Sequence, residues 1–213
     1  MAHQLTPSDL INNDKYELIE SVDYTSIKSF VLREIRHKST LLRIYGIVQL
    51  IAAIIIFVLL GYHVATSIHA KTVLPEVKAM LLAALFTFTL IIPIHESIHA
   101  IAFLIFGKRD ISFGVQWKKF LFYAESNMQV LDRKQMLFVA LLPLIVISVV
   151  ALIGISFCKS LPSILFCGIT LLIHLFFCSG DLTIISFFQR HKAHEVYTFD
   201  NRKEKRTYYY KEK

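Results

Sequence analysis

Cysteine is scarce in this chain, which has three in 213 residues and no C-x-x-C spacing. An odd number of cysteines in or beside apolar runs excludes a disulfide scaffold, and their spacing offers no thiolate zinc motif. We expect each thiol to pack as a small apolar side chain. Cys178 stands apart because it precedes Asp181 by three positions.

Acidic residues are nearly missing from the long apolar runs. The chain is 55% hydrophobic, and four runs are long enough to cross a bilayer core of about 30 Å, namely residues 44–62, 79–106, 136–157 and 164–188. Across them, after Arg43, only Glu96 and Asp181 are acidic. Carboxylates are costly in hydrocarbon, so these two mark a candidate site. The pattern predicts an all-α membrane protein with four transmembrane helices.

A signal peptide is also missing, because the first 40 residues contain no apolar core and no small-residue cleavage site. We expect residues 1–40 to remain in the protein as a cytoplasmic N-terminal segment. Ile27, Phe30, Val31 and Ile35 recur at helical spacing and predict a short amphipathic helix. It lies either on the inner leaflet or against the protein's own cytoplasmic part.

Basic residues exceed acidic ones, with a formal net charge of +7, yet their distribution argues against a nucleic-acid partner. With a cytoplasmic amino terminus, only Lys71, Lys78 and Lys159 of the 23 lysines and arginines fall in outside loops. This positive-inside bias predicts a multi-pass protein of the bacterial cytoplasmic membrane, with both termini cytoplasmic. The basic excess also attracts anionic membrane lipid.

The sequence His95-Glu96-Ser97-Ile98-His99 is an H-E-x-x-H motif inside the second apolar run. Residues four apart share one helix face, so His95 and His99 can bind one metal ion, with Glu96 beside them as a base toward water. This is the zincin arrangement. The alternative is that the three side chains only hydrogen-bond across a helix bundle. Pro93 predicts a break in the helix just before the motif.

Depth in the membrane indicates a third ligand. Taking Phe106 and Phe188 as inner ends, His99 and Asp181 both lie seven residues inside the apolar runs, about 10 Å deep. We therefore predict a zinc site of His95, His99 and Asp181. His174 competes for the third position, but two further helical turns place it about 10 Å away, which favours a packing or water-path role.

In two stretches, apolar and polar residues alternate, as they do in β-strands. One predicts a cytoplasmic β-hairpin at about 109–126, between the second and third spans, which either plugs the bundle or offers a strand edge to an extended peptide. The other, within the basic tail 191–213, predicts strands at 196–199 and 206–210 joined by a turn, with a disordered tail as the alternative. The domain between the ends, 41–190, is then the membrane-embedded part.

Three segments together give a family resemblance: His95-Glu96-Ser97-Ile98-His99, the Ala-Leu-Leu-Pro of 140–143, and Ser179-Gly180-Asp181. The chain resembles, from about 40 to 190, the small bacterial membrane proteins called putative zincin peptidases, which are similar to the site-2 protease group of intramembrane metalloproteases. The resemblance implies zinc bound by His95, His99 and Asp181, with Glu96 as catalytic base. The site-2 group usually has Asp-Gly at the third ligand, where this chain has Gly-Asp.

These observations predict a zinc-dependent, membrane-embedded metalloendopeptidase. It would hydrolyse peptide bonds of membrane-associated or transmembrane-segment substrates near the cytoplasmic face, after local unwinding of the substrate helix. The alternative is a membrane protein that binds zinc for structure, sensing or transport, without proteolysis. Glu96 discriminates between the two, because a structural zinc site needs no base.

Overall fold

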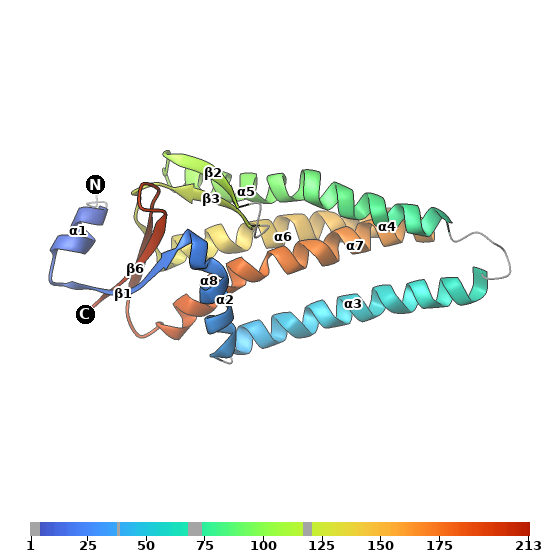
Figure 1. Ribbon diagram of the computed structural model, residues 1–213, viewed down its shortest axis with the longest axis horizontal. Helices are drawn as coiled ribbons and strands as arrows, with labels where there is room; N and C mark the ends of the chain where they lie inside the picture. Colours follow the sequence, from blue (N-terminus) through green and yellow to red (C-terminus); the bar gives the residue numbers. More distant parts are fainter. Residues whose placement is uncertain (1–4, 38, 68–73, 117–120) are drawn as a thin grey trace. The chain divides into compact units, whose positions relative to one another are not determined.

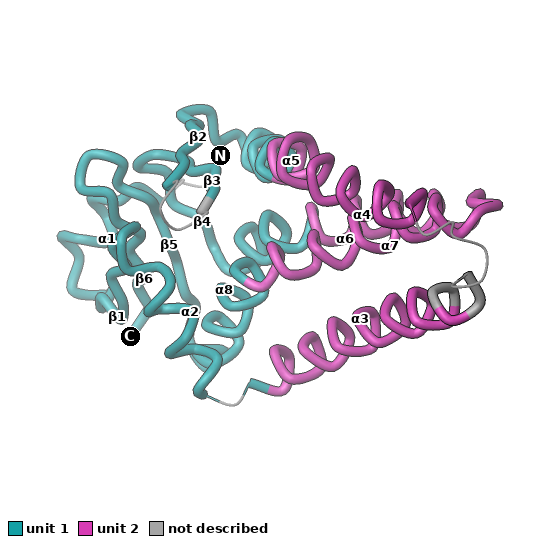
Figure 2. The backbone as a smooth tube through the Cα atoms, turned by 45° about the vertical axis from the view of Figure 1, so that its right-hand side comes forward, with its two compact units in different colours: residues 1–39, 96–142, 180–213 teal, residues 40–95, 143–179 magenta. Residues whose placement is uncertain are grey.

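The computed structural model describes residues 5–37, 39–67, 74–116 and 121–213. Contacts divide the chain into two units (Figure 2): unit 1 comprises residues 1–39, 96–142 and 180–213, and unit 2 comprises 40–95 and 143–179. The division passes through three helices, α5 (Ile92–Ile105), α6 (Arg133–Phe157) and α8 (Ser179–Arg190). Each unit is therefore described separately.

Unit 2 is built from apolar helices. It contains α3 (Thr40–Ser67), α4 (Leu74–Phe86), η2 (Thr87–Ile91), α7 (Leu161–Phe177) and parts of α5 and α6. Helix α4 lies beside α7 (Figure 1), and Ala83, Leu165 and Ile169 are buried between them. In the described residues, Thr40–Tyr62, Leu74–Ile105 and Arg133–Phe157 are long and apolar enough to cross a membrane, and the pair α7 and α8 makes a fourth candidate. The chain is thus mostly helical, with three to four candidate spans.

The second candidate span is irregular where Pro93 predicted a break. Residues Thr87–Ile91 form η2, a π-helical turn, immediately before α5. Proline lacks the N–H that would continue the α-helical ladder, and a wider turn accommodates this loss. At the other end of α5, Gly107 has φ of +73°, and the N–H of Lys108 donates to the Phe103 carbonyl at 3.0 Å. This is a Schellman end, which glycine favours.

The fourth run differs from the sequence expectation of one unbroken helix over 164–188. It is two helices, α7 and α8, bent by 40° at Cys178. The bend leaves carbonyls of the last turn of α7 without helical partners. The Leu175 carbonyl instead accepts hydrogen bonds from Tyr45 Oη at 2.6 Å and Gln49 Nε2 at 2.9 Å, both on α3. These polar side chains from a neighbouring helix stabilise the bend.

Unit 1 contains a four-stranded antiparallel sheet in the order β1-β6-β5-β4. Its strands are β1 (Tyr16–Asp23), β6 (Arg206–Glu212), β5 (Val196–Asn201) and β4 (Leu131–Asp132). The predicted tail hairpin is confirmed, because β5 and β6 pair from Val196–Lys211 to Asn201–Arg206. The sequence did not predict β1 or β4, so the all-α class needs a correction: a small sheet stands beside the helices.

A second, two-stranded sheet lies in the stretch where alternation predicted a hairpin. Strands β2 (Ile111–Gln116) and β3 (Leu121–Ser126) pair in antiparallel register, from Ile111–Ser126 to Gln116–Leu121. Residues 117–120, part of that predicted hairpin, lie outside the described residues. Gly114 faces Tyr123 across the pair, and a Cβ at Gly114 would lie 2.1 Å from the Tyr123 ring. Glycine is therefore required for this ring to cover the strand.

Beside its strands, unit 1 contains the helices α1 (Pro7–Asn12) and α2 (Ile27–Arg36) and nearly all of α8. The predicted amphipathic helix is confirmed as α2, and it packs on its own unit: the Phe30 ring lies 5.6 Å from that of Phe187 and 6.1 Å from that of Tyr209. Glu34, one turn on, is fully buried and accepts a hydrogen bond from Arg190 Nη2 at 2.5 Å. The apolar face of α2 is therefore buried against other residues of unit 1.

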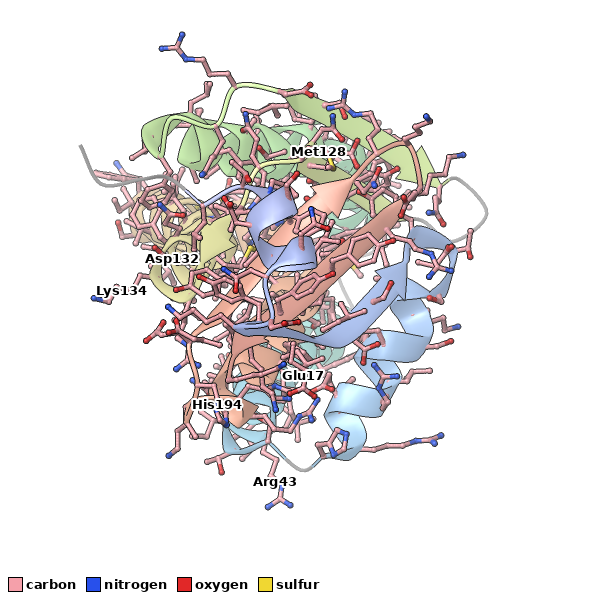
Figure 3. All side chains as sticks on the ribbon, turned by 90° about the vertical axis from the view of Figure 1, so that its left-hand side faces the viewer. Glu17, Arg43, Met128, Asp132, Lys134 and His194 are labelled. Carbon is pink, nitrogen blue, oxygen red and sulfur yellow. The ribbon has the colours of Figure 1, made fainter. Side chains whose placement is uncertain are left out.

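Charged side chains cover the outer surface of unit 1. Glu17 on β1, labelled in Figure 3, pairs with Lys211 on β6 at 3.0 Å. Asp132, at the end of β4, Lys134, in the first turn of α6, and His194, before β5, are labelled in the same view. Exposed pairs of this kind contribute about 1 kcal/mol or less each, so the apolar core, not these charges, stabilises the unit.

Candidate metal centre

The H-E-x-x-H motif lies on α5, as its spacing predicted. His95 and His99 are one turn apart on this helix, and both are buried, with 5% and 7% of their surface exposed. Ile98, Ala102 and Phe103 are buried on the same helix, so apolar packing fixes the face that carries the motif. The contact division passes between His95, which belongs to unit 2, and Glu96, which belongs to unit 1.

The orientation of His99 depends on a carbonyl of α6 that a proline leaves free. Pro143 lies inside α6 and cannot donate an N–H to the carbonyl of Val139, four residues earlier. His99 Nδ1 lies 2.9 Å from that carbonyl oxygen. Since a carbonyl can only accept, Nδ1 carries a proton, and Nε2 is the nitrogen that remains available to a metal. The Ala-Leu-Leu-Pro segment thereby acquires a physical role.

The structure brings His99 and Asp181 together. Asp181 lies in the first turn of α8, where a helix terminus favours negative charge. Its Oδ1 is 3.4 Å from His99 Nε2, longer than the 2.7–3.2 Å typical of an N–H···O bond. Two ligand bonds of about 2.1 Å at the tetrahedral angle place their ligand atoms about 3.4 Å apart. The pair therefore fits two ligands of one zinc ion.

Glu96 follows His95 directly on α5 and is half-buried. Its carboxylate is the only acidic group on this helix. Its Oε2 is buried, so the carboxylate points at least partly into the protein.

Within unit 2, His95 lies beside two residues from the bend between α7 and α8. His95 Nδ1 is 3.2 Å from His174 Nε2, and the sulfur of Cys178 is 3.4 Å from the same His174 nitrogen. All three side chains are buried. The sequence analysis assigned His174 a packing or water-path role, and the structure places it directly against a candidate ligand. The one sequence signal for this cluster was the four-residue spacing of His174 and Cys178.

A comparison with protein-family models identifies a match over residues 88–196, just over half of the chain, to the family described as "Putative zincin peptidase". The chain belongs to this family. No curated protein sequence and no solved structure matches it. The matched range contains the H-E-x-x-H motif, Pro143 and Asp181. His99 and Asp181, which lie close together in the structure, are therefore both within the part of the chain that the family model matches. The family description indicates a metallopeptidase.

Proposed function

We propose that this protein is a zinc-dependent peptidase that hydrolyses membrane-associated peptides or transmembrane segments near the cytoplasmic face of the cell membrane. His95, His99 and Asp181 would hold the zinc, and Glu96 would be the catalytic base. The observation that carries the proposal is the 3.4 Å separation of His99 Nε2 and Asp181 Oδ1, with His99 Nδ1 bonded to the Val139 carbonyl. Each residue then offers the atom that a metal site needs.

Zinc, when bound, and the side chains of the protein would have separate roles in the reaction. The chemistry that zinc supplies when bound is polarisation of the scissile carbonyl and a lower pKa for a coordinated water. Glu96 accepts the proton of the attacking water and passes it to the leaving amine as the C–N bond breaks. The Val139 carbonyl holds the His99 ring in one tautomer throughout, so this imidazole does not exchange protons with the substrate.

The three to four candidate spans in the described residues support the proposed membrane location; one of them contains the motif and another contains Pro143. A substrate helix has its peptide groups hydrogen-bonded, so it must unwind locally before attack. The unit 1 hairpin of β2 and β3 has only two strands, and an unwound segment could pair with its edge by main-chain hydrogen bonds. We therefore expect preference for substrates with helix-breaking residues near the cytoplasmic side.

Zinc content is the direct test of the ligand set. The measurement uses detergent-purified Cys178→Ser protein, so that the thiol beside His95 cannot contribute a ligand. About one zinc per chain is expected in this background, with loss in Asp181→Ala and His99→Ala and retention in Glu195→Ala, a matched exposed acid. Retention of zinc in both ligand variants, with normal solubility, would show that the site lies elsewhere.

Cleavage tests the role of Glu96. A transmembrane peptide with a Gly-Pro pair near one end, placed in liposomes with the purified protein, should be cut by the wild type. Glu96→Gln should keep its zinc and lose at least about 100-fold in cleavage rate, which is the size of a general-base contribution. Equal cleavage by Glu96→Gln would remove Glu96 from the reaction and favour a non-proteolytic zinc protein.

A further inference from the structure

The cluster His95, His174 and Cys178 is buried more completely than its polarity would suggest. The exposed fractions are 5%, 1% and 0%, respectively. His174 lies in the last turn of α7, and Cys178 is the C-cap of that helix, one turn on. All three residues belong to unit 2, and each contributes a nitrogen or sulfur atom that can ligate a metal.

The three distances between the ligand atoms agree with a single ion. They are 3.2 Å from His95 Nδ1 to His174 Nε2, 3.4 Å from His174 Nε2 to Cys178 Sγ and 4.0 Å from Cys178 Sγ to His95 Nδ1. Tetrahedral bonds of about 2.1 Å to nitrogen and about 2.3 Å to sulfur require about 3.4 Å between nitrogens and about 3.6 Å between nitrogen and sulfur. The three separations lie within about 0.4 Å of these values, so they are close to those between the ligands of one ion.

The donor set selects the kind of ion. Two imidazoles and a thiolate suit borderline and soft cations such as Zn²⁺, Co²⁺ or Cu⁺ and disfavour Mg²⁺ and Ca²⁺, which prefer oxygen. The position at the end of α7 adds favourable interaction, because the last carbonyls of a helix attract cations. Binding releases the thiol proton of Cys178 to solvent and leaves a thiolate on the ion.

We propose that His95, His174 and Cys178 form a second metal site, for a soft cation, which competes with the His95–His99–Asp181 site for the imidazole of His95. The competing role rests on the proposed function. A neutral imidazole has one lone-pair nitrogen, so His95 cannot serve two ions at once without losing its second proton. A soft ion bound to His95, His174 and Cys178 would therefore withdraw His95 from the peptidase site and inhibit the enzyme.

Cobalt binding tests the second site without any substrate. The full chain is purified in detergent with a phosphine reductant, and Co²⁺ is added while the near-ultraviolet sulfur-to-cobalt absorption is recorded. Asp181→Ala should show this absorption, and Asp181→Ala with Cys178→Ser should lose it and bind Co²⁺ more weakly by at least about 100-fold, the upper end of the cost of losing an outer-shell partner. Cys167→Ser in the Asp181→Ala background is the matched control and should keep the absorption.

A second measurement covers the case in which Asp181→Ala does not fold. His99→Ala, which removes the peptidase site through a different residue, should show the sulfur absorption with excess Co²⁺, and His99→Ala combined with Cys178→Ser or His174→Ala should not. Absence of the absorption from saturated His99→Ala overturns the proposal. If cobalt binds without sulfur absorption and Asp181→Ala abolishes it, the peptidase site stands and the second site falls. If Cys178→Ser abolishes all metal binding while Asp181→Ala has no effect, the second site stands and the proposed peptidase ligands are wrong.

Discussion

His99 makes two contacts that differ in kind, and together they define its chemistry. Nδ1 donates to the Val139 carbonyl at 2.9 Å, and Nε2 lies 3.4 Å from the Asp181 carboxylate. A histidine held in this way has a protonated Nδ1 and a fixed ring plane before any ion arrives. The residue type and its motif could be identified from the sequence, but this orientation could not, because the acceptor is a backbone atom of another helix.

Asp200 provides a test at the scale of one side chain outside the membrane segments. Burial in unit 1 raises the pKa of Asp200 from 3.8 to about 6, although Thr207 Oγ1 donates to its carboxylate at 2.6 Å. The folded chain therefore holds an extra proton between about pH 4 and pH 6, and the corresponding stability is lost as pH rises through 6. Asp200→Asn should remove this loss, because a neutral amide needs no proton.

The measurement is the thermal unfolding midpoint of purified protein, followed by tyrosine fluorescence at pH 5 and pH 7. The fall in midpoint between these pH values should be smaller in Asp200→Asn than in the wild type. Asp14→Asn, in an exposed turn, should behave as the wild type does. Parallel pH dependence in all three proteins would contradict the role of Asp200.

At the scale of the element, Pro143 connects a helix irregularity to the metal centre. Proline in α6 frees the Val139 carbonyl, and His99 occupies it. In Pro143→Ala the new N–H can donate to that carbonyl and compete with His99. We expect zinc affinity to fall by about 10- to 100-fold, the usual cost of losing an outer-shell partner, while α6 itself becomes more regular.

Zinc affinity measured by chelator competition, in the Cys178→Ser background, tests this expectation. A matched control is Leu144→Ala, which shortens the next side chain of α6 without supplying a new N–H. An unchanged affinity in Pro143→Ala would mean that the carbonyl contact does not orient His99.

The elements also show which features sequence patterns can and cannot predict. Helix α2 and the hairpin of β5 and β6 were predictable, because local periodicity encodes them. Strand β1 was not, since its partner β6 is distant in sequence. The bend at Cys178 was also missed, because Tyr45 and Gln49 stabilise it from another helix. The cluster of His95, His174 and Cys178 depends on that bend, so it too was beyond sequence reasoning.

At the scale of the whole molecule, the distribution of lysine and arginine predicts both termini in the cytoplasm. A single cysteine at Lys203, in the exposed turn between β5 and β6, should be protected from an impermeant maleimide in intact cells. A cysteine at Lys159, exposed between α6 and α7, should be labelled. The background carries Cys158→Ser, Cys167→Ser and Cys178→Ser. The reverse labelling pattern, or labelling of both sites, would contradict the predicted orientation.

The pairing of β1 with β6 determines when this sheet can form during biosynthesis. Strand β1 is synthesised before all of the apolar helices, and β6 is synthesised after them. Strand β1 therefore lacks its β6 partner until all of the helices between them have been synthesised. Closure of this sheet is then a late step in maturation, and a nascent or truncated chain that lacks β6 carries the full H-E-x-x-H motif without completing the unit that contains Glu96. Under the proposed function, such an order would delay proteolytic competence until synthesis has passed β6.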